Sequence, residues 1–309
     1  MRICNLASSS DGNCTYIEEN GVKILIDAGL SCAQLEQRLS DIGVSPSSIN
    51  AIFITHEHTD HIKGVNIFAS KHKTDVFTHK LNWNVLDNKF DKLKSNQKFE
   101  IADVFDYKGL KISTIEIPHD AVRTTAYRVD FENKAVSVIT DIGNLSQDIL
   151  NFAKNCPLVY LESNHDPEML KANPKYSPSL KRRILGDHGH LSNMQSARAI
   201  EQLVYTGTRQ FVLSHLSQHN NLPQLAYDNA CEFLKTRDII EGKHLKIDVA
   251  SPNIGHIFRM WTLKFHKSNV FWYGHKFFQI CKLLCFLLDK NSPYISKVSF
   301  IFILRFFNK

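Results

Sequence analysis

The stretch "AIFITHEHTDHIKG", residues 51–64, decides the fold. Its first five residues are apolar or β-branched, which predicts a buried strand. His56, His58, Asp60 and His61 follow within six positions. Imidazole nitrogens and carboxylate oxygens are ligands that Zn²⁺ or Mn²⁺ accepts, and a loop after a buried strand is held rigidly. The stretch therefore predicts a metal site at the edge of a sheet.

Four donors at this spacing favour two adjacent ions over one. Two ions about 3.5–4 Å apart need further ligands, ideally including a carboxylate that bridges them. His119 follows the strand-like "KISTIEIP", Asp141 follows "AVSVIT" and His215 follows "QFVLS". Functional side chains gather at such strand ends, so these three residues are the candidate remaining ligands. Asp27, at the end of "VKILI", is a candidate carboxylate for orienting a ligand histidine, with a plain turn residue as the alternative.

The rest of the main domain divides into two β-rich blocks, each followed by helices. A capping signal at Ser31 and Gln34 predicts a helix that ends at Gly43, and Ser192 with Gln195 predicts another. The predicted strands are residues 1–7, 14–18, 22–26, 51–55, 75–78, 110–117, 125–131, 134–140, 157–162 and 210–214. Two sheets packed face to face with helices outside give a four-layer αββα sandwich of the α/β (α+β) class.

Composition indicates the number of domains and the cellular location. The chain has 309 residues, 43% hydrophobic and 22% charged, which is typical of a globular protein with one large domain. The seven cysteines are scattered and form no CxxC pair, which favours a reducing, cytoplasmic location over a disulfide framework. No secretory signal is visible in the first 25 residues.

The end of the chain differs in kind from what precedes it. Residues 262–309 hold nine of the twenty Phe and eight Lys or Arg against one acidic residue, so the net charge of +6 belongs to this segment. Its apolar runs are shorter than the roughly 20 residues of a spanning helix, so no integral membrane span is predicted. We predict a catalytic domain over residues 1–258 and an atypical Phe/Lys-rich extension over 259–309. The extension's role is open between membrane-surface contact, an extra packed element and an out-of-family end such as a frameshift produces.

"THEHTDHIKG" resembles the HxHxDH signature of the metallo-β-lactamase superfamily, and the match covers about residues 1–256. "SSSDGNCTYIE", "LESNHDPEML", "GDHGHLSN" and "LSHLSQHNNLPQLA" narrow the resemblance to the YycJ/WalJ (VicX) group, bacterial cytoplasmic proteins described as exonucleases acting on DNA from the 5′ end. The resemblance implies two divalent ions, Zn²⁺ or Mn²⁺ with Fe also open. It implies one ion at His56, His58 and His119, the other at Asp60, His61 and His215, and Asp141 as the bridge.

The ligands alone do not choose the substrate, because lactamases, thioester hydrolases and nucleases share this core. Phosphodiester hydrolysis gains from an acid that protonates the leaving oxygen. His190 in "GHLSN" and Glu162 in "LESN" resemble the catalytic pair of transfer-RNA 3′-processing enzymes of this fold, where Glu162 would hold His190 protonated and oriented. A helix-capping histidine beside a structural glutamate is the alternative. The further candidates for substrate contact are His165, His188, Ser192 and Asn193.

The sequence thus predicts a metal-dependent phosphodiesterase, a 5′ to 3′ DNA exonuclease using a hydroxide activated by two metals, with Asp60 or the metals as proton acceptor. DNA is the expected partner, with RNA also open. Only 74 residues separate Asp141 from His215, which leaves no room for the inserted domain of β-CASP nucleases. A basic cluster at 181–183 is a candidate phosphate contact or a solvated loop. The alternatives are a hydrolase of small esters, thioesters or cyclic phosphodiesters, and a non-catalytic regulatory partner in a cell-wall signalling pathway.

Overall fold

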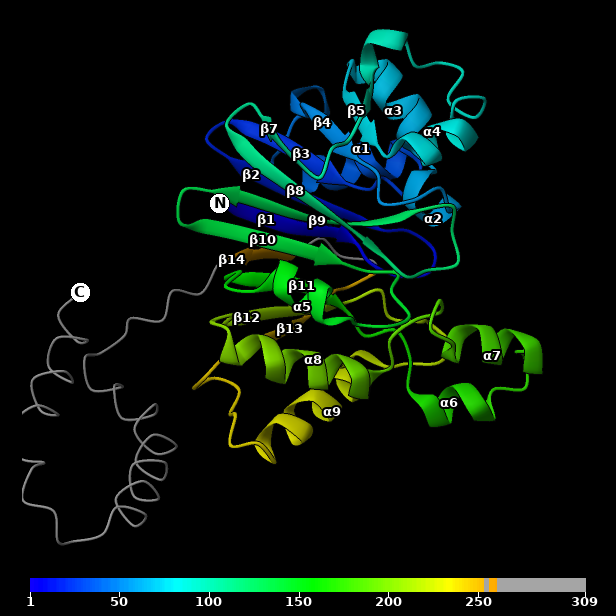
Figure 1. Cartoon of the computed structure of the whole chain (residues 1–309). Coiled ribbons are helices and arrows are strands. Elements are labelled where there is room, and N and C mark those ends of the chain that lie inside the picture. Colours follow the sequence, from blue (N-terminus) through cyan, green and yellow to red (C-terminus); the bar gives the residue numbers. More distant parts are fainter. Residues whose placement is uncertain (253–255, 260–309) are drawn as a thin grey trace, which may run out of the picture. The chain divides into compact units, whose positions relative to one another are not determined.

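Two seven-stranded sheets lie face to face, with helices on both outer sides (Figure 1). The computed structural model describes residues 1–252 and 256–259. The strand order is β14-β1-β2-β3-β4-β5-β6 in the first sheet and β13-β12-β11-β10-β9-β8-β7 in the second. This arrangement confirms the predicted four-layer αββα sandwich.

The first sheet combines an antiparallel and a parallel half. β1 to β3 pair antiparallel, β4 to β6 continue parallel to β3, and β14 pairs antiparallel with β1. Its strands are β1 (Arg2–Ala7), β2 (Cys14–Glu19), β3 (Val22–Ile26), β4 (Ala51–Phe53), β5 (Asp75–Thr78), β6 (Lys98–Glu100) and β14 (His256–Arg259). Its helices are α1 (Cys32–Asp41), α2 (Thr59–Ile62), α3 (Val65–His72) and α4 (Lys80–Leu86). The predicted Ser31–Gln34 capping box opens α1, which buries Leu35 and Leu39.

The second sheet is an antiparallel meander that becomes parallel from β10 onward. Its strands are β7 (Val104–Tyr107), β8 (Leu110–Ile117), β9 (Thr124–Phe131), β10 (Lys134–Ile139), β11 (Leu158–Glu162), β12 (Gln210–Ser214) and β13 (Lys246–Val249). The helices that follow these strands are α5 (Gln147–Ala153), α6 (Pro167–Ala172), α7 (Pro178–Leu185), α8 (Asn193–Tyr205) and α9 (Pro223–Lys235). Strands β8, β10, β11 and β12 therefore all run in one direction.

Three apolar cores separate the four layers. Phe53, Tyr127 and Tyr160 belong to the core between the sheets. Ile52 and Ile54, the neighbours of Phe53, belong instead to the core between the first sheet and its helices. Side chains alternate across a strand, so a continuous apolar run such as residues 51–54 is what a strand buried on both faces requires. The core between the second sheet and its helices includes Leu161, Ile200 and Leu213.

Some boundaries and elements differ from the prediction. The strand before the loop that carries His56 to His61 ends at Phe53, not at residue 55. The backbone N–H of Thr55 donates to the Asp27 carboxylate at 2.8 Å and therefore makes no hydrogen bond to a neighbouring strand. The short strands β6, β7, β13 and β14 were not predicted. Within the described residues, no helix is both long and apolar enough to cross a membrane. The extension predicted from residue 259 lies outside the described residues, apart from Arg259 itself.

Candidate metal centre and active site

The seven candidate metal ligands lie where strands of the two sheets end. His56, His58, Asp60 and His61 occupy the loop and the short helix α2 after β4. His119, Asp141 and His215 follow β8, β10 and β12 of the second sheet, which run in the same direction. Strands that run in one direction present their carboxyl ends at one edge, and this edge faces the loop after β4. The structure therefore brings all seven side chains together.

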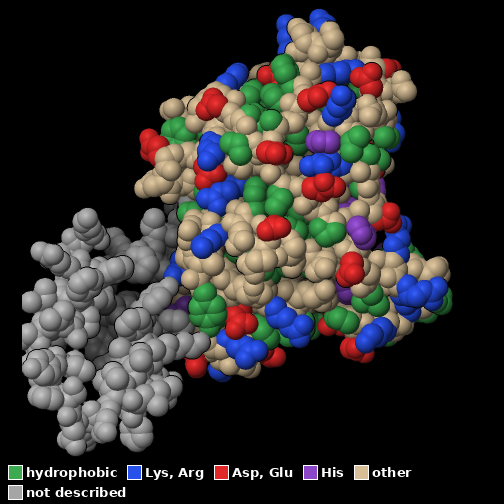
Figure 2. All heavy atoms as spheres, viewed as in Figure 1, with side chains coloured by type: hydrophobic (Ala, Val, Ile, Leu, Met, Phe, Trp, Pro, Cys, Tyr) green, Lys and Arg blue, Asp and Glu red, His purple; other side chains and the backbone are tan. Residues whose placement is uncertain are grey.

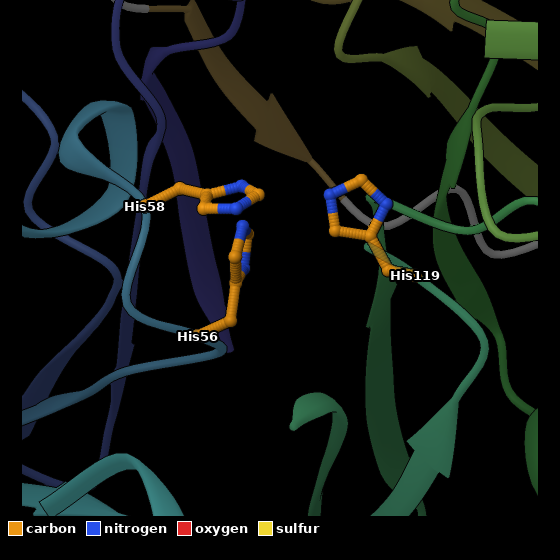
Figure 3. A group of neighbouring side chains, drawn as sticks. All are labelled: His56, His58 and His119. Atoms are coloured by element: carbon orange, nitrogen blue, oxygen red, sulfur yellow. The ribbon is translucent and has the colours of Figure 1, made fainter. Parts of the chain in front are cut away.

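His56, His58 and His119 form the first group (Figure 3). Each offers a ring nitrogen, and these nitrogens lie within 4.8 Å of one another. His56 and His58 approach from the side of the first sheet and His119 from the side of the second, with their rings turned towards the space between them. Thr55 Oγ1 lies 3.0 Å from His56 Nδ1, and His119 Nδ1 lies 3.1 Å from the Gly189 carbonyl. These contacts fix the rings and leave Nε2 of both for a ligand.

Asp60, His61 and His215 form the second group. Asp60 Oδ2 lies 3.4 Å from His61 Nε2 and 3.9 Å from His215 Nε2. The opposite nitrogen of His61, Nδ1, is 2.7 Å from Asp27 Oδ2. Asp27 is also held by the N–H and hydroxyl of Thr55. Asp27 thus lies where the sequence placed it, behind a candidate ligand histidine and oriented towards it.

Asp141 lies between the two groups. Its Oδ2 is 3.1 Å from His61 Nε2 and 2.9 Å from His215 Nδ1, while Oδ1 is 3.6 Å from His119 Nε2. The side chain is buried. This is the position that a bridging carboxylate would need, with one oxygen towards each group.

Three atoms at the centre of the cluster are buried without a hydrogen-bond partner of acceptable geometry. They are His56 Nε2, Asp141 Oδ2 and His215 Nδ1. His56 Nε2 has no hydrogen-bond partner, and Asp141 Oδ2 and His215 Nδ1 lie 2.9 Å apart without good hydrogen-bond geometry. Buried polar atoms are normally well paired, so ligand atoms left in this way, of the type that holds Zn²⁺ or Mn²⁺, fit a cation. The residues present therefore fit divalent metal ions.

The charges of the cluster support the same conclusion. Burial lowers the pKa of His56 well below its ordinary value, so its ring is neutral and able to bind a metal. Burial acts in the same direction on His61 and His215, but the carboxylates around them prevail. Asp141 above all raises the pKa of His61 well above its ordinary value and that of His215 to about 10. Burial alone would raise the pKa of Asp141, yet these two histidines hold it well below its usual range. Bound cations would take the place of the protons that neutralise these carboxylates.

Glu162 and His190, the predicted acid pair, are in contact. Glu162 Oε1 lies 2.8 Å from His190 Nδ1. Its Oε2 accepts the N–H groups of Ile142 and Leu191, both at 3.0 Å. Burial would raise the pKa of Glu162, but His190 and His215 lower it to about 2. The carboxylate is therefore ionised and fixed at both oxygens. The structure adds a contact that was not predicted, because Glu162 Oε1 also lies 3.3 Å from His215 Nδ1.

Two features of the backbone position these side chains. Asp27, Asp141 and His215 have φ of 61°, 59° and 55°, in the left-handed region that non-glycine residues rarely adopt. Asp27 and His215 follow directly on β3 and β12, and Asp141 follows one residue after β10. Gly29 allows the second feature, since a Cβ there would lie 1.6 Å from the Asp60 carbonyl oxygen. The loop after β3 can therefore pack backbone to backbone against the metal loop.

The family of the chain follows from its similarity to known proteins. Residues 22–216 match the family described as Beta-lactamase superfamily domain. The chain belongs to this superfamily. Exodeoxyribonuclease WalJ of Streptococcus pneumoniae serotype 2 (strain D39 / NCTC 7466) is 35% identical over 252 residues, 80% of this chain and 93% of the relative. Exodeoxyribonuclease YycJ of Bacillus anthracis is 32% identical over 251 residues, 81% of this chain and 95% of the relative. The resemblance to the YycJ/WalJ group is thereby confirmed.

A solved structure has the same fold. Unliganded yeast PDE1 superposes with a TM-score of 0.64 at 13% identity, over 84% of this chain and 99% of that one. At this identity the likeness concerns the architecture alone.

Asn13 is a further residue of the candidate site, and the sequence did not predict it. Its Nδ2 lies 3.1 Å from His61 Nε2 and 3.3 Å from Asp60 Oδ2. The only signal was its place at the end of the turn-rich segment "SSSDGN", where asparagine is also an ordinary turn residue. Asn13 becomes part of the site through a contact with residues almost fifty positions away.

The four further substrate-contact candidates fare differently. His165 is 1% exposed, neither of its ring nitrogens has a hydrogen-bond partner, and burial lowers its pKa to about 4. His188 is exposed and belongs to none of the metal-binding groups. Ser192 caps α8 through a capping box, as predicted. Asn193 is bonded to Ser163 and Asn221 inside the protein. The side chains of Ser192 and Asn193 are therefore occupied in holding the fold, and a substrate role for any of the four stays a prediction.

Proposed function

We propose that the protein is a metal-dependent exodeoxyribonuclease that degrades DNA in the 5′ to 3′ direction. The relatives named exodeoxyribonuclease align with most of this chain and are themselves covered almost fully. The observation that carries the proposal is the Glu162–His190 pair beside the candidate metal cluster. A thioester expels a thiolate, which needs no such acid, whereas cleavage of a phosphodiester expels an alkoxide that must be protonated.

The proposed cofactors are two divalent ions, Zn²⁺ or Mn²⁺ with Fe also open, held by the seven candidate ligands. Such ions supply an activated water nucleophile and neutralise the charge of the phosphate. Asp60, whose pKa stays below its ordinary value because His61 offsets the effect of burial, accepts a proton from that water. Glu162 fixes Nδ1 of His190, so that Nε2 can deliver a proton to the leaving oxygen.

Two polar loops beside the cluster support a phosphate-containing substrate. The loop between β1 and β2 and the loop after β12 are joined by hydrogen bonds. The His215 N–H donates to Ser8 Oγ at 2.7 Å, and Gln218 Nε2 donates to Asp11 Oδ2 at 2.8 Å. Hydroxyl and amide groups contact phosphate and sugar oxygens in many nucleic-acid complexes without much positive charge.

The proposed catalytic domain covers residues 1–258, although β14 continues to Arg259. The extension from residue 259 and its membrane-surface contact stay predictions. The cytoplasmic location rests on the cysteine pattern of the sequence. RNA as a second substrate is a question for the assay below.

The test uses the purified full chain with Mn²⁺ or Zn²⁺ and with 5′- or 3′-labelled single-stranded DNA, duplex DNA and RNA. We expect His58→Ala to lose at least about 10³-fold of the DNA degradation by removing a ligand, and His190→Ala about 10²–10⁴-fold by removing the acid. A p-nitrophenyl ester of thymidine 5′-phosphate separates the two roles, because its leaving group needs no proton. His190→Ala should retain most activity on this ester, and His58→Ala should not.

The control variant is His79→Asn, which removes a histidine from the N-cap of α4 but keeps a capping side chain. It should behave as the wild type. Full activity of His190→Ala on DNA would remove the acid assignment. Turnover of a lactone or thioester without degradation of any nucleic acid would replace the nuclease proposal with the small-molecule hydrolase.

A further inference from the structure

A helical arm separates the two members of the Glu162–His190 pair in the chain. It consists of residues 167–189, with α6 and α7, and we call it the α6–α7 arm. Figure 1 shows the two helices projecting from the rest of the domain at the lower right. α7 contains no buried residue. The apolar cores therefore do not explain why a helix is present here.

The α6–α7 arm has a net charge of +3, whereas the rest of residues 1–261 has a net charge of −4. It carries five Lys or Arg and only Glu168 and Asp187 as acidic residues. Figure 2 shows Lys and Arg side chains gathered over α7. Lys171 pairs with Glu168, whereas Lys175, Lys181 and Arg182 have no carboxylate within ion-pair distance in the part of the chain that the structure describes. Lys181 donates to the exposed main-chain carbonyl of Lys171, which leaves its charge unneutralised. Cations without carboxylate partners remain available to an anionic ligand.

The carboxyl end of α7 leads straight into the candidate active site. The His190 N–H donates to the Ile184 carbonyl at 3.0 Å, and the Gly189 carbonyl is the group that contacts His119 Nδ1. Arg183 forms an ion pair with Asp120, the residue after His119. The cationic helix is thus fixed to both the candidate acid and a candidate metal ligand, and a polymer lying across the metals would pass beside it.

We propose that the α6–α7 arm binds the phosphate backbone of the DNA strand next to the bond being cleaved. The inference rests on the proposed nuclease function and deepens it. α7 has eight residues, which corresponds to a length of about 12 Å. In duplex DNA each strand carries one phosphate per ~3.4 Å of helix axis, so a helix of this length can reach about three to four phosphates of a strand that runs along it. Lys181 and Arg182 are the principal contacts, and Arg183 exchanges Asp120 for a phosphate, with which an arginine can form two parallel hydrogen bonds.

The main test reverses two charges on α7 with Lys181→Glu/Arg182→Glu in the full chain. The matched control is Lys89→Glu/Lys92→Glu, which makes the same charge change at two exposed lysines after α4. Fluorescence anisotropy gives the Kd of a labelled single strand, and exonuclease assays give kcat and KM. For the α7 variant we expect Kd and KM to rise at least about 10-fold. The slope of log Kd against log salt should fall by about 1.4 in magnitude, that is ~0.7 per lost phosphate contact.

Hydrolysis of the thymidine p-nitrophenyl ester, which is too short to reach along α7, reports whether the site itself is intact. A fall on DNA with the ester reaction retained supports the α6–α7 arm as a DNA contact. Equal falls on both substrates would make α7 a structural support of the site and overturn the inference.

A second variant tests the Arg183 exchange by gain of binding. Asp120→Asn removes the carboxylate that competes with phosphate, so Kd for DNA should fall several-fold. No change in Kd would overturn the exchange.

The outcomes also separate this inference from the proposed function. If the wild type degrades DNA and both charge-reversal variants bind and degrade it equally well, the arm inference fails and the nuclease proposal stands. If the wild type neither binds nor degrades DNA, both fail. If poly-glutamate binds as tightly as DNA and the α7 variant loses both ligands, the surface serves an acidic polypeptide instead, which also overturns the inference.

Discussion

His165 should set part of the acid limit of stability of this protein. Its imidazole is 1% exposed and its ring nitrogens have no hydrogen-bond partner, so burial lowers its pKa to about 4. In the unfolded chain the pKa of a histidine is about 6.5. Between these two values the unfolded state binds a proton that the folded state does not. The free energy of unfolding therefore falls as the pH drops from 6.5 towards 4, and it suffers no such loss above 6.5.

The size of the effect follows from the two pKa values. The full difference between 6.5 and 4 corresponds to about 3 kcal/mol, reached only below the lower value. Between about pH 7.5 and about pH 5, the part expressed is about 2 kcal/mol. Because His165 is almost fully buried, screening by solvent reduces this free energy only slightly.

The assay is denaturant unfolding of the wild type and His165→Gln at both pH values, with EDTA present so that metal binding does not contribute. The wild type should lose about 2 kcal/mol more than His165→Gln on acidification. His188→Gln, which removes an imidazole from an exposed position, is the matched control and should follow the wild type. Identical pH dependence of the wild type and His165→Gln would refute the reasoning, because the buried imidazole would then have no part in acid destabilisation.

Three further changes have expected outcomes. Asp27→Asn should weaken metal binding about 10–100-fold, because the amide holds His61 less firmly than the carboxylate does; competition with a chelator measures this, and unchanged affinity would contradict it. Gly29→Ala should destabilise by more than about 4 kcal/mol or abolish folding, since its Cβ would overlap the Asp60 carbonyl; a thermal melt like that of the wild type would disprove the close approach. Phe53→Ala, at a fully buried position between the sheets, should cost about 3–5 kcal/mol in denaturant unfolding, and a cost below about 1 kcal/mol would argue against the inter-sheet core.

Local patterns were enough to predict the sandwich and the candidate ligands that lie together at its edge. A strand buried on both faces must be apolar throughout, as residues 51–54 are, and a polar residue directly after such a run can lie only at the sheet edge. Asp141 and His215 were found in this way. Helices α1 and α8 were predicted because their caps are local, each formed by residues three positions apart.

Features without a local pattern were not predicted. α7 buries no residue, so no apolar period announces it, and β6 has only three residues, too few for an alternation to be read. His188 and His190 are the same residue type two positions apart, yet only His190 reaches Glu162; the family resemblance, and no local pattern, had singled out His190 for this pair. The parts played by Asn13 and by the Glu162–His215 contact depend on residues brought together across about fifty positions of chain. Such contacts exist only once the two sheets have packed.

The left-handed turns at Asp27, Asp141 and His215 limit which amino acids these positions can hold. Aspartate, asparagine, histidine and glycine tolerate this backbone, whereas β-branched residues do not. The residue types proposed to bind or support a metal here are thus largely the types that this backbone conformation accepts, so a substitution that disturbs the turn tends also to remove a candidate ligand. The centre is consequently preorganised when the protein folds, so an arriving ion meets side chains already in place and little of its binding energy goes into ordering them. For trapping bound DNA without cleavage, Asp141→Asn is accordingly the better choice than Asp141→Ala, because asparagine keeps the turn while removing the charge.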